Sequence, residues 1–155
     1  MARYFASGTS AAALTNGSAI AAVVPAAAVA CKIVRATFGV VNAGGTISDF
    51  QVGVGINRAT ARGTATATTT GTKADPDTAA SQITGVDTTW SVQPTLAAAD
   101  AVTVGFNTRG GVDMPFPTND LMSTVGTANA IVFVNRSGAT LPASHQITYT
   151  IEWEE

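Results

Sequence analysis

Charged residues are scarce in this chain: Asp, Glu, Lys and Arg make up 12% of its 155 residues, about half the share of a typical globular domain. The net charge is −2. The basic residues are dispersed, so no run of them can follow a phosphate backbone, and no basic amphipathic helix favours a membrane surface. We therefore expect no nucleic-acid partner and no membrane partner. The basic residues are Arg3, Lys32, Arg35, Arg58, Arg62, Lys73, Arg109 and Arg136.

Histidine and cysteine are almost absent, with His145 and Cys31 as the only examples. A cupin-type metal site needs several histidines, and a zinc site needs more Cys or His than this, so we expect no metal and no cofactor. His145 follows Pro-Ala-Ser, which predicts a solvated loop position. One cysteine cannot form an intrachain disulfide, which fits folding in a reducing cytoplasm. We expect Cys31 to be a small buried hydrophobic residue.

Long apolar runs are also missing, apart from residues 19–30 directly before Cys31. This arrangement loosely resembles a bacterial lipoprotein signal. The preceding stretch is long and nearly uncharged, Pro25 interrupts the run, and alanine dominates it, all of which argue against a signal. A membrane span needs about 20 apolar residues, more than this run has. We therefore assign the segment to the folded domain.

The residues needed for catalysis do not form a recognisable motif. A nucleophilic Ser or Cys needs a base, His145 is the only imidazole, and no G-x-S-x-G elbow surrounds a serine. Glycoside hydrolysis needs two carboxylates across a cleft, but the aspartates fall mostly in predicted turns, where Asp bonds its own backbone. We expect no enzyme and no catalytic residue. The aspartates are Asp49, Asp75, Asp77, Asp87, Asp100, Asp113 and Asp120.

Asp75 and Asp77 also raise the question of calcium, because carboxylate oxygens are its preferred ligands. No loop-ligand pattern accompanies them, so a capping role is favoured. Asp75 is well placed as an N-cap, with Pro76 at the first helical position. The sequence therefore predicts one short helical turn at 75–80, within a long connection from about 71 to 85.

Alternation of apolar and polar residues dominates the rest of the chain. Its clearest case is 146–154, where Ile147, Tyr149, Ile151 and Trp153 share one face and the polar residues between them are expected to face water. The same pattern predicts further strands, and the continuous apolar run 130–134 predicts a strand buried on both faces. Roughly eight strands result. The other strands are expected at 34–40, 50–56, 86–92 and 102–106, with weaker candidates at 20–24 and 64–70.

These strands are separated by turn signals such as Asn16-Gly17 and Ser137-Gly138. Short strands joined by one or two long connections favour a two-sheet antiparallel sandwich of jelly-roll type. We expect an all-β fold with at most one short helix. One domain spans 1–155, and residues 1–31 form an extended N-terminal arm or a first strand.

Aromatic residues are few, and most belong to the predicted core. A sugar-stacking platform would use Trp90, Trp153, Tyr149 and Phe116. Trp153 and Tyr149 share their face with two isoleucines, however, and Trp90 falls in register with Val86 and Val92. We therefore expect core packing rather than a ligand platform.

Gly53 and Gly55 fall on the polar face of the 50–56 strand. Two explanations remain open. A missing side chain lets another backbone or a partner approach closely, and it also allows a bulge or a bend in the sheet.

Several segments resemble small bacteriophage virion proteins, namely capsid decoration proteins and related head-surface proteins with jelly-roll-like sandwiches. The matching segments cover most of residues 32–155. The resemblance implies a structural protein that is made in the host cytoplasm, binds the outer surface of an assembled capsid and has no enzyme activity. Its partners would be the major capsid protein and further copies of itself. The segments are 33–40 (IVRATFGV), 53–64 (GVGINRATARGT), 89–95 (TWSVQPT), 128–135 (ANAIVFVN) and 147–155 (ITYTIEWEE).

The physical character of the surface agrees with this role. A surface of Ala, Thr and Gly loses little hydration and little side-chain entropy when a partner covers it. The N-terminal segment could add a strand to a neighbour, and a trimer suits a three-fold position of a shell. Two alternatives stay open: a receptor- or carbohydrate-binding module of a virion tail or surface, and a self-assembling shell or fibre subunit.

Overall fold

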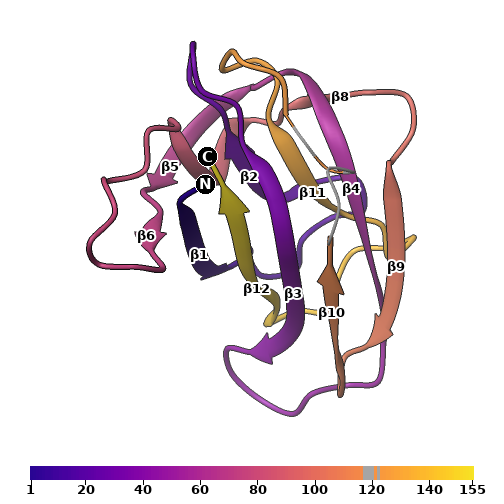
Figure 1. The fold of residues 1–155 in the computed structure, drawn as a ribbon. Coiled ribbons are helices and arrows are strands. Elements are labelled where there is room, and N and C mark those ends of the chain that lie inside the picture. Colours follow the sequence, from indigo (N-terminus) through magenta and orange to yellow (C-terminus); the bar gives the residue numbers. More distant parts are fainter. Residues whose placement is uncertain (117–120, 122) are drawn as a thin grey trace.

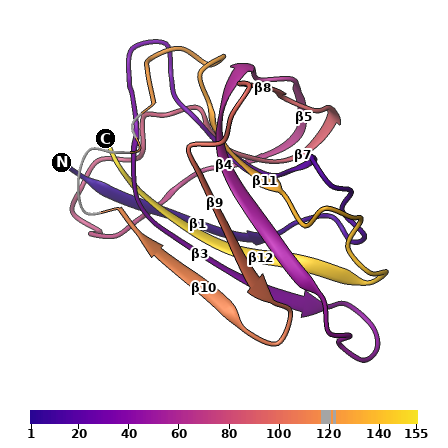
Figure 2. The ribbon, with the colours of Figure 1, turned by 90° about the vertical axis from the view of Figure 1, so that its right-hand side faces the viewer.

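The structure is a computed structural model that describes residues 1–116, 121 and 123–155. Two antiparallel β-sheets pack face to face (Figures 1 and 2), which confirms the predicted two-sheet sandwich. The described residues form twelve strands rather than about eight, and no helix. The strands are β1 (Arg3–Thr9), β2 (Ala19–Val24), β3 (Lys32–Asn42), β4 (Gln51–Ala61), β5 (Thr64–Thr69), β6 (Thr72–Lys73), β7 (Gly85–Val92), β8 (Thr95–Leu96), β9 (Val102–Asn107), β10 (Gly111–Pro115), β11 (Ile131–Asn135) and β12 (His145–Glu154).

The five-stranded sheet has the strand order β10-β3-β12-β1-β6. The seven-stranded sheet has the order β5-β7-β2-β11-β4-β8, and β9 also pairs with β4. The chain passes from the second sheet to the first at both sides of the sandwich, through the connections β5–β6 and β9–β10 (Figure 1). Each sheet therefore contains neighbouring strands that are far apart in the sequence.

The four strands that the sequence pattern missed have weak signals. β6 and β8 contain two residues each. The inward positions of β1 include Ala6 and Gly8 beside Tyr4, so its apolar alternation is faint. β10 ends in Pro115, and proline argues against a strand unless that strand lies at an edge, where β10 does lie.

The helical turn predicted at 75–80 does not form. The Asp75 side chain accepts a hydrogen bond from the Asp77 amide at 3.0 Å, and the Asp75 carbonyl accepts one from the Thr78 amide at 3.2 Å. These bonds close a turn, and the chain then continues through bends rather than a helix. The capping chemistry of Asp75 is thus present without a helix to cap.

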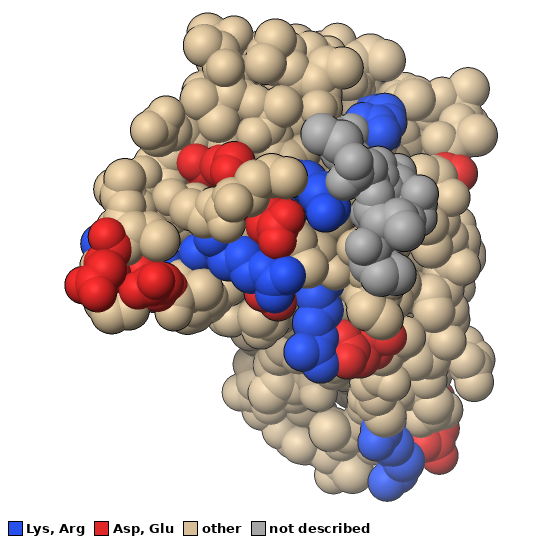
Figure 3. All heavy atoms as spheres, viewed as in Figure 1, with Lys and Arg blue, Asp and Glu red and all other residues tan. Residues whose placement is uncertain are grey.

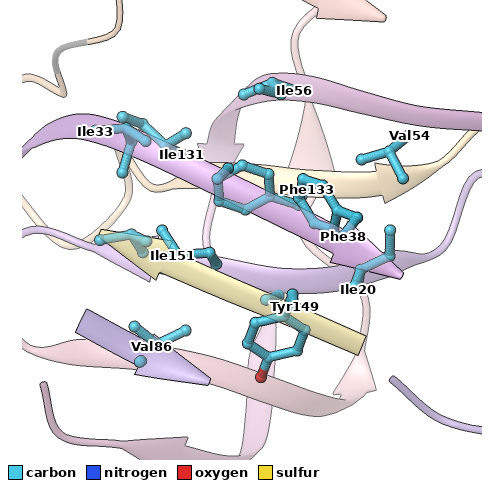
Figure 4. Close-up of a cluster of buried hydrophobic side chains, with 14 of the residues drawn as sticks. Ile20, Ile33, Phe38, Val54, Ile56, Val86, Ile131, Phe133, Tyr149 and Ile151 are labelled. Carbon is cyan, nitrogen blue, oxygen red and sulfur yellow. The ribbon is translucent and has the colours of Figure 1, made fainter. Parts of the chain in front are cut away.

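The main core lies between the sheets and follows the predicted alternation on β12. Ile147, Ile151 and Trp153 have no exposed surface. Phe38 from one sheet meets Phe133 from the other, with ring centroids 5.5 Å apart (Figure 4). Trp153 stacks on Tyr4 with centroids 6.1 Å apart, so the aromatic residues of the C-terminal strand belong to the core.

The seven-stranded sheet has a second apolar cluster on its outer face. On β11, Ile131 and Phe133 face the main core, whereas Val132 and Val134 face this second cluster, so the strand is buried on both faces as predicted. Trp90 and Leu96 pack against the cluster. The segment between β7 and β8 crosses over it, and its Gln93 side chain accepts a hydrogen bond from the Ala19 amide at 2.9 Å. We call this outer surface the covered face.

The N-terminal segment 1–31 is built into both sheets. β1 lies between β12 and β6, and β2 lies between β7 and β11. All six residues of β2 are buried. The segment therefore supplies interior strands of its own domain rather than a free arm.

The alternation predicted for 86–92 is wrong in its second half. Val86 lies in the main core, but Trp90 packs against the second cluster on the opposite face, and Val92 is 59% exposed. The pairing of β7 with β5 carries register shifts at several positions. Such bulges insert an extra residue and reverse the faces of the residues that follow.

Candidate functional site

His145 is buried rather than solvated, which corrects the sequence prediction. It is the first residue of β12 and is only 2% exposed. Its Nε2 accepts a hydrogen bond from the Ser48 amide at 3.3 Å, and its Nδ1 lies 3.2 Å from the Ala143 carbonyl. Because an amide can only donate, Nε2 must be the unprotonated nitrogen and Nδ1–H the donor. The ring therefore ties two loops to the sheet.

Cys31 is buried, as expected, and 1% exposed. Its thiol donates a hydrogen bond to the Ser123 hydroxyl at 3.4 Å, and its amide donates to the same oxygen at 2.9 Å. Burial raises the pKa of the thiol to about 11. A thiol that stays protonated at neutral pH is a poor nucleophile, so Cys31 joins β3 to the loop before β11 in a structural role.

Two aspartates with little or no exposed surface are held in separate ion pairs. Arg62 contacts Asp87 through two nitrogens, both at 2.7 Å, and the Asp87 side chain has no exposed surface. Arg136 contacts Asp100 through two nitrogens at 2.8 Å, and Asn57 adds a hydrogen bond at 2.7 Å. These contacts, with the Arg136 bond as the largest cause, hold the pKa of Asp100 below its usual range.

Exposed ion pairs hold two further aspartates, Asp49 with Arg109 and Asp113 with Arg35. Asp75 and Asp77 share the turn described above and are both exposed. Among the described residues, no group of three or more His, Cys, Asp or Glu side chains is arranged to hold a metal ion. Asp120 lies outside the described residues.

The structure decides between the two explanations for Gly53 and Gly55. A Cβ atom on Gly53 would lie 2.4 Å from the Arg136 carbonyl oxygen, and one on Gly55 would lie 2.3 Å from a carboxylate oxygen of Asp100. Both glycines therefore make room on the covered face for the chain after β11 and for the Arg136–Asp100 pair. The close neighbour is this chain's own backbone at Gly53 and its own Asp100 and Arg136 side chains at Gly55.

The described surface contains at least two hollows. The larger, of about 430 Å³, is lined by Arg58, Ala59, Ser123, Thr124 and Asn129. The smaller, of about 110 Å³, lies beside Trp90 and Gln93. The indole Nε1 of Trp90 is buried without a hydrogen-bond partner, although the residue as a whole packs on the second cluster. Phe116 packs against the main core. No group of exposed aromatics like a sugar platform forms from the four candidates.

The outer face of the five-stranded sheet remains uncovered, and we call it the open face. Strand register places its outward side chains in rows. Arg3, Glu154 and Lys32 form one row, and Ser7, Thr150 and Thr37 form another. The members of the open face are Arg3, Phe5, Ser7, Thr9, Lys32, Arg35, Thr37, Gly39, Val41, Asp113, Gln146, Thr148, Thr150, Glu152 and Glu154.

One half of the open face carries all of its charge, as an alternating band of blue and red side chains (Figure 3). Three cations and three carboxylates cancel: Arg3, Lys32 and Arg35 against Glu152, Glu154 and Asp113. The Arg3 hydrogen bond, with smaller help from Lys32, holds the pKa of Glu154 below its usual range. The other half has no charged residue and consists largely of Thr, Ser and Gly. Its Thr37 borders the charged half and donates a hydrogen bond to Asp113 at 3.2 Å.

Sequence reasoning did not identify this face as a unit. Its outward residues on β12 were predicted to face water, but those on β1 and β10 belong to strands that the pattern missed. The missing signal was cross-strand pairing, because Ser7 and Thr37 lie 30 residues apart in sequence and yet flank the same residue, Thr150.

No protein-family model, no curated protein and no solved structure matches this chain. Within the described residues, no helix has the length and apolar character needed to cross a membrane.

Proposed function

We propose that this protein is a structural virion protein that binds the outer surface of a bacteriophage capsid as a decoration or accessory head protein. The major capsid protein is its partner, and the open face is the contact surface. The observation that carries the proposal is the uncharged half of that face, a wide sheet surface of short side chains around Thr148 and Thr150.

Covering this half with a partner costs little free energy because its side chains are short. Ser, Thr and Gly lose little rotamer freedom when they become ordered, and no charge on Ser7, Thr9, Thr37, Thr148 or Thr150 has to leave water. The neighbouring charged half is already neutral within itself. Paired charges of this kind position a partner and set the association rate more than they add affinity.

Co-sedimentation with empty capsid shells tests the proposal. We expect the wild-type protein to pellet with shells up to a fixed number of copies and to stay in the supernatant without them. Thr148→Arg places a long cation in the uncharged half and should reduce bound protein at least tenfold. Ala128→Arg adds the same charge at an exposed loop position away from the open face and should bind like wild type.

Equal binding by both variants would show that the open face is not the contact surface, and no binding by the wild type would disprove capsid binding itself.

A carbohydrate-binding role has one observation in its favour, the unpaired Trp90 N–H beside the 110 Å³ hollow. Glycan-array binding that Trp90→Ala abolishes in a folded protein would replace the capsid proposal with that role.

A further inference from the structure

The seven-stranded sheet ends on β5 at one side and on β8 and β9, which pair with different parts of β4, at the other. Among the described residues, the outer edges of the two longer strands, β5 and β9, have no partner. β5 pairs only with β7, and β9 pairs only with β4. The two strands lie at opposite sides of the molecule (Figure 1). Each contains six residues. An unpaired edge presents a row of backbone N–H and C=O groups that can template another strand.

Both of these edges lack charged residues and proline, two features that normally prevent such pairing. Natural edge strands are blocked by charged residues, by proline or by very short length. β5 reads TATATT and β9 reads VTVGFN, with no charge and no proline. In the five-stranded sheet, by contrast, edge strand β10 carries Asp113 and Pro115, and edge strand β6 has two residues including Lys73. Among the described residues, only the seven-stranded sheet has six-residue edge strands without charge or proline.

The directions of the two edge strands are complementary. Five antiparallel pairings separate them, along the path β9-β4-β11-β2-β7-β5. An odd number of reversals makes β5 run opposite to β9. When a second copy is placed beside the first by rotation about an axis along the strands, its β5 therefore lies antiparallel to the first copy's β9. That is the pairing already used throughout the sheet.

We propose that the chain self-associates head to tail, with β5 of one copy pairing with β9 of the next. Such a contact joins two different surfaces, and repeated copies close into a ring when the rotation between them permits it. The proposal goes beyond capsid binding and does not depend on it. Each interface leaves the open face free, because that face belongs to the other sheet.

The contact has a built-in limit on its strength. The pairing of β5 with β7 contains three register shifts, and bulges twist an edge strand away from a flat partner. A short contact between two six-residue edges falls in the class of weak interfaces. We therefore expect association in about the micromolar range rather than a permanent oligomer.

Light scattering on two blocked variants tests the pairing. Ala67→Lys places a cation on the exposed edge of β5. Gly105→Lys does the same on β9, where a Cβ atom would have only an ordinary contact, 3.8 Å from the Val52 carbonyl oxygen. The matched control is Ala128→Lys, which adds the same charge at an exposed loop position outside both edge strands. Circular dichroism verifies that each variant is folded, and Thr103→Lys replaces Gly105→Lys if the latter is not.

We expect the wild type and Ala128→Lys to gain mass between about 1 and 200 µM, the range around a micromolar dissociation constant. Each blocked variant alone should stay monomeric. An equimolar mixture of the two should form a dimer and nothing larger, because one intact β5 then meets one intact β9.

Three results would overturn the pairing: a wild type that stays monomeric throughout, a Gly105→Lys variant that associates like wild type, or a mixture that fails to recover a dimer. The second result would indicate pairing of β5 with β5. Because no shell is present in these measurements, their outcome is independent of the co-sedimentation result.

Discussion

The outer surfaces of the two sheets differ in what covers them. The open face of the five-stranded sheet meets solvent directly, so its strands alternate between buried and exposed residues. The covered face of the seven-stranded sheet lies under the β7–β8 segment, Trp90 and Leu96, so β2 and β11 are buried throughout. Sheets that are wet on one side carry alternating patterns, and sheets covered on both sides carry continuous apolar runs.

The same type of ion pair occurs at both surfaces, but it is exposed at one and buried at the other. Each carries an arginine that grips an aspartate with two nitrogens: Arg35 with Asp113 on the open face, and Arg62 with Asp87 beside the covered face. The first pair is about half exposed, with side-chain exposures of 55% and 45%. In the second pair the Asp87 side chain has no exposed surface. Equal geometry in unequal surroundings makes the comparison testable.

Removing the arginine from each pair should give the largest contrast. Arg62→Ala leaves a fully buried carboxylate without its cation, although the Thr68 hydroxyl still donates a hydrogen bond to it, and we expect the variant to lower the free energy of unfolding by about 3 kcal/mol. Arg35→Ala leaves a carboxylate in water, and its denaturation midpoint should hardly move. Urea denaturation of both variants measures the difference. Equal losses would mean that burial does not separate the two faces.

Adding one methyl group to each surface should give the next largest contrast. Gly53→Ala places a Cβ atom 2.4 Å from the Arg136 carbonyl oxygen on the covered face, so backbone must move, and we expect a loss of about 2–3 kcal/mol. Gly39→Ala on the open face meets only the Thr148 hydroxyl, at 3.0 Å, which can rotate away. Its thermal midpoint should stay close to wild type. A neutral Gly53→Ala would show that the chain after β11 does not press on β4.

Acid should act more strongly through the part-buried pair than through the exposed one. The pKa of Asp100 and that of Asp113 are both lowered, mainly by their hydrogen bonds from Arg136 and Arg35. A lowered folded pKa adds stability that is present above the unfolded value and is lost as pH falls through the folded pKa. We expect Asp100→Asn to flatten the loss of stability between about pH 5 and pH 2.

Asp113→Asn should have a smaller effect on that slope, and about 0.5 M salt should erase it, because salt screens exposed pairs most. Unfolding free energies measured across this pH range, with and without salt, provide the check. A larger or salt-resistant effect at Asp113 would contradict the ranking of the two surfaces.

The smallest expected effect is on the rate at which a thiol reagent labels Cys31. This rate tests whether the two sheets unfold as one cooperative unit. Cys31 directly precedes β3 of the five-stranded sheet. Its amide and thiol donate hydrogen bonds to the hydroxyl of Ser123, which lies in the loop that leads to β11 of the seven-stranded sheet. Because burial raises its pKa to about 11, a thiol reagent at pH about 8 should label it only on unfolding. Labelling at the global unfolding rate supports one cooperative unit. Much faster labelling would mean that this border opens locally.

Local pattern carried much of the prediction. The period-two run of β12 placed Ile147, Tyr149, Ile151 and Trp153 on the core side, and the apolar run of β11 was correctly interpreted as buried on both faces. Composition also placed Cys31 inside. The pattern failed where a bulge changed register, as at Trp90 and Val92, and where inward positions held small residues, as at Ala6 and Gly8 of β1.

Nothing in the local sequence distinguished the sites that depend on distant neighbours. His145 follows a Pro-Ala-Ser turn and was expected in water, but the amide of Ser48, nearly a hundred residues earlier in the chain, closes over it. Gly53 could equally have marked a bend until Arg136 was seen against it. The open face became visible only when β1, β3 and β12 were placed side by side.

The amino-acid sequence by itself therefore determined the class of fold, the inward side of its strongest strands and the scarcity of charge, because alternation and composition are properties of neighbouring residues. The tertiary structure alone decided which arginine meets which aspartate, which sheet is covered and which strand edges stay unpaired. Those features arise from contacts between segments far apart in the chain, and such contacts leave no trace in the local pattern of either segment.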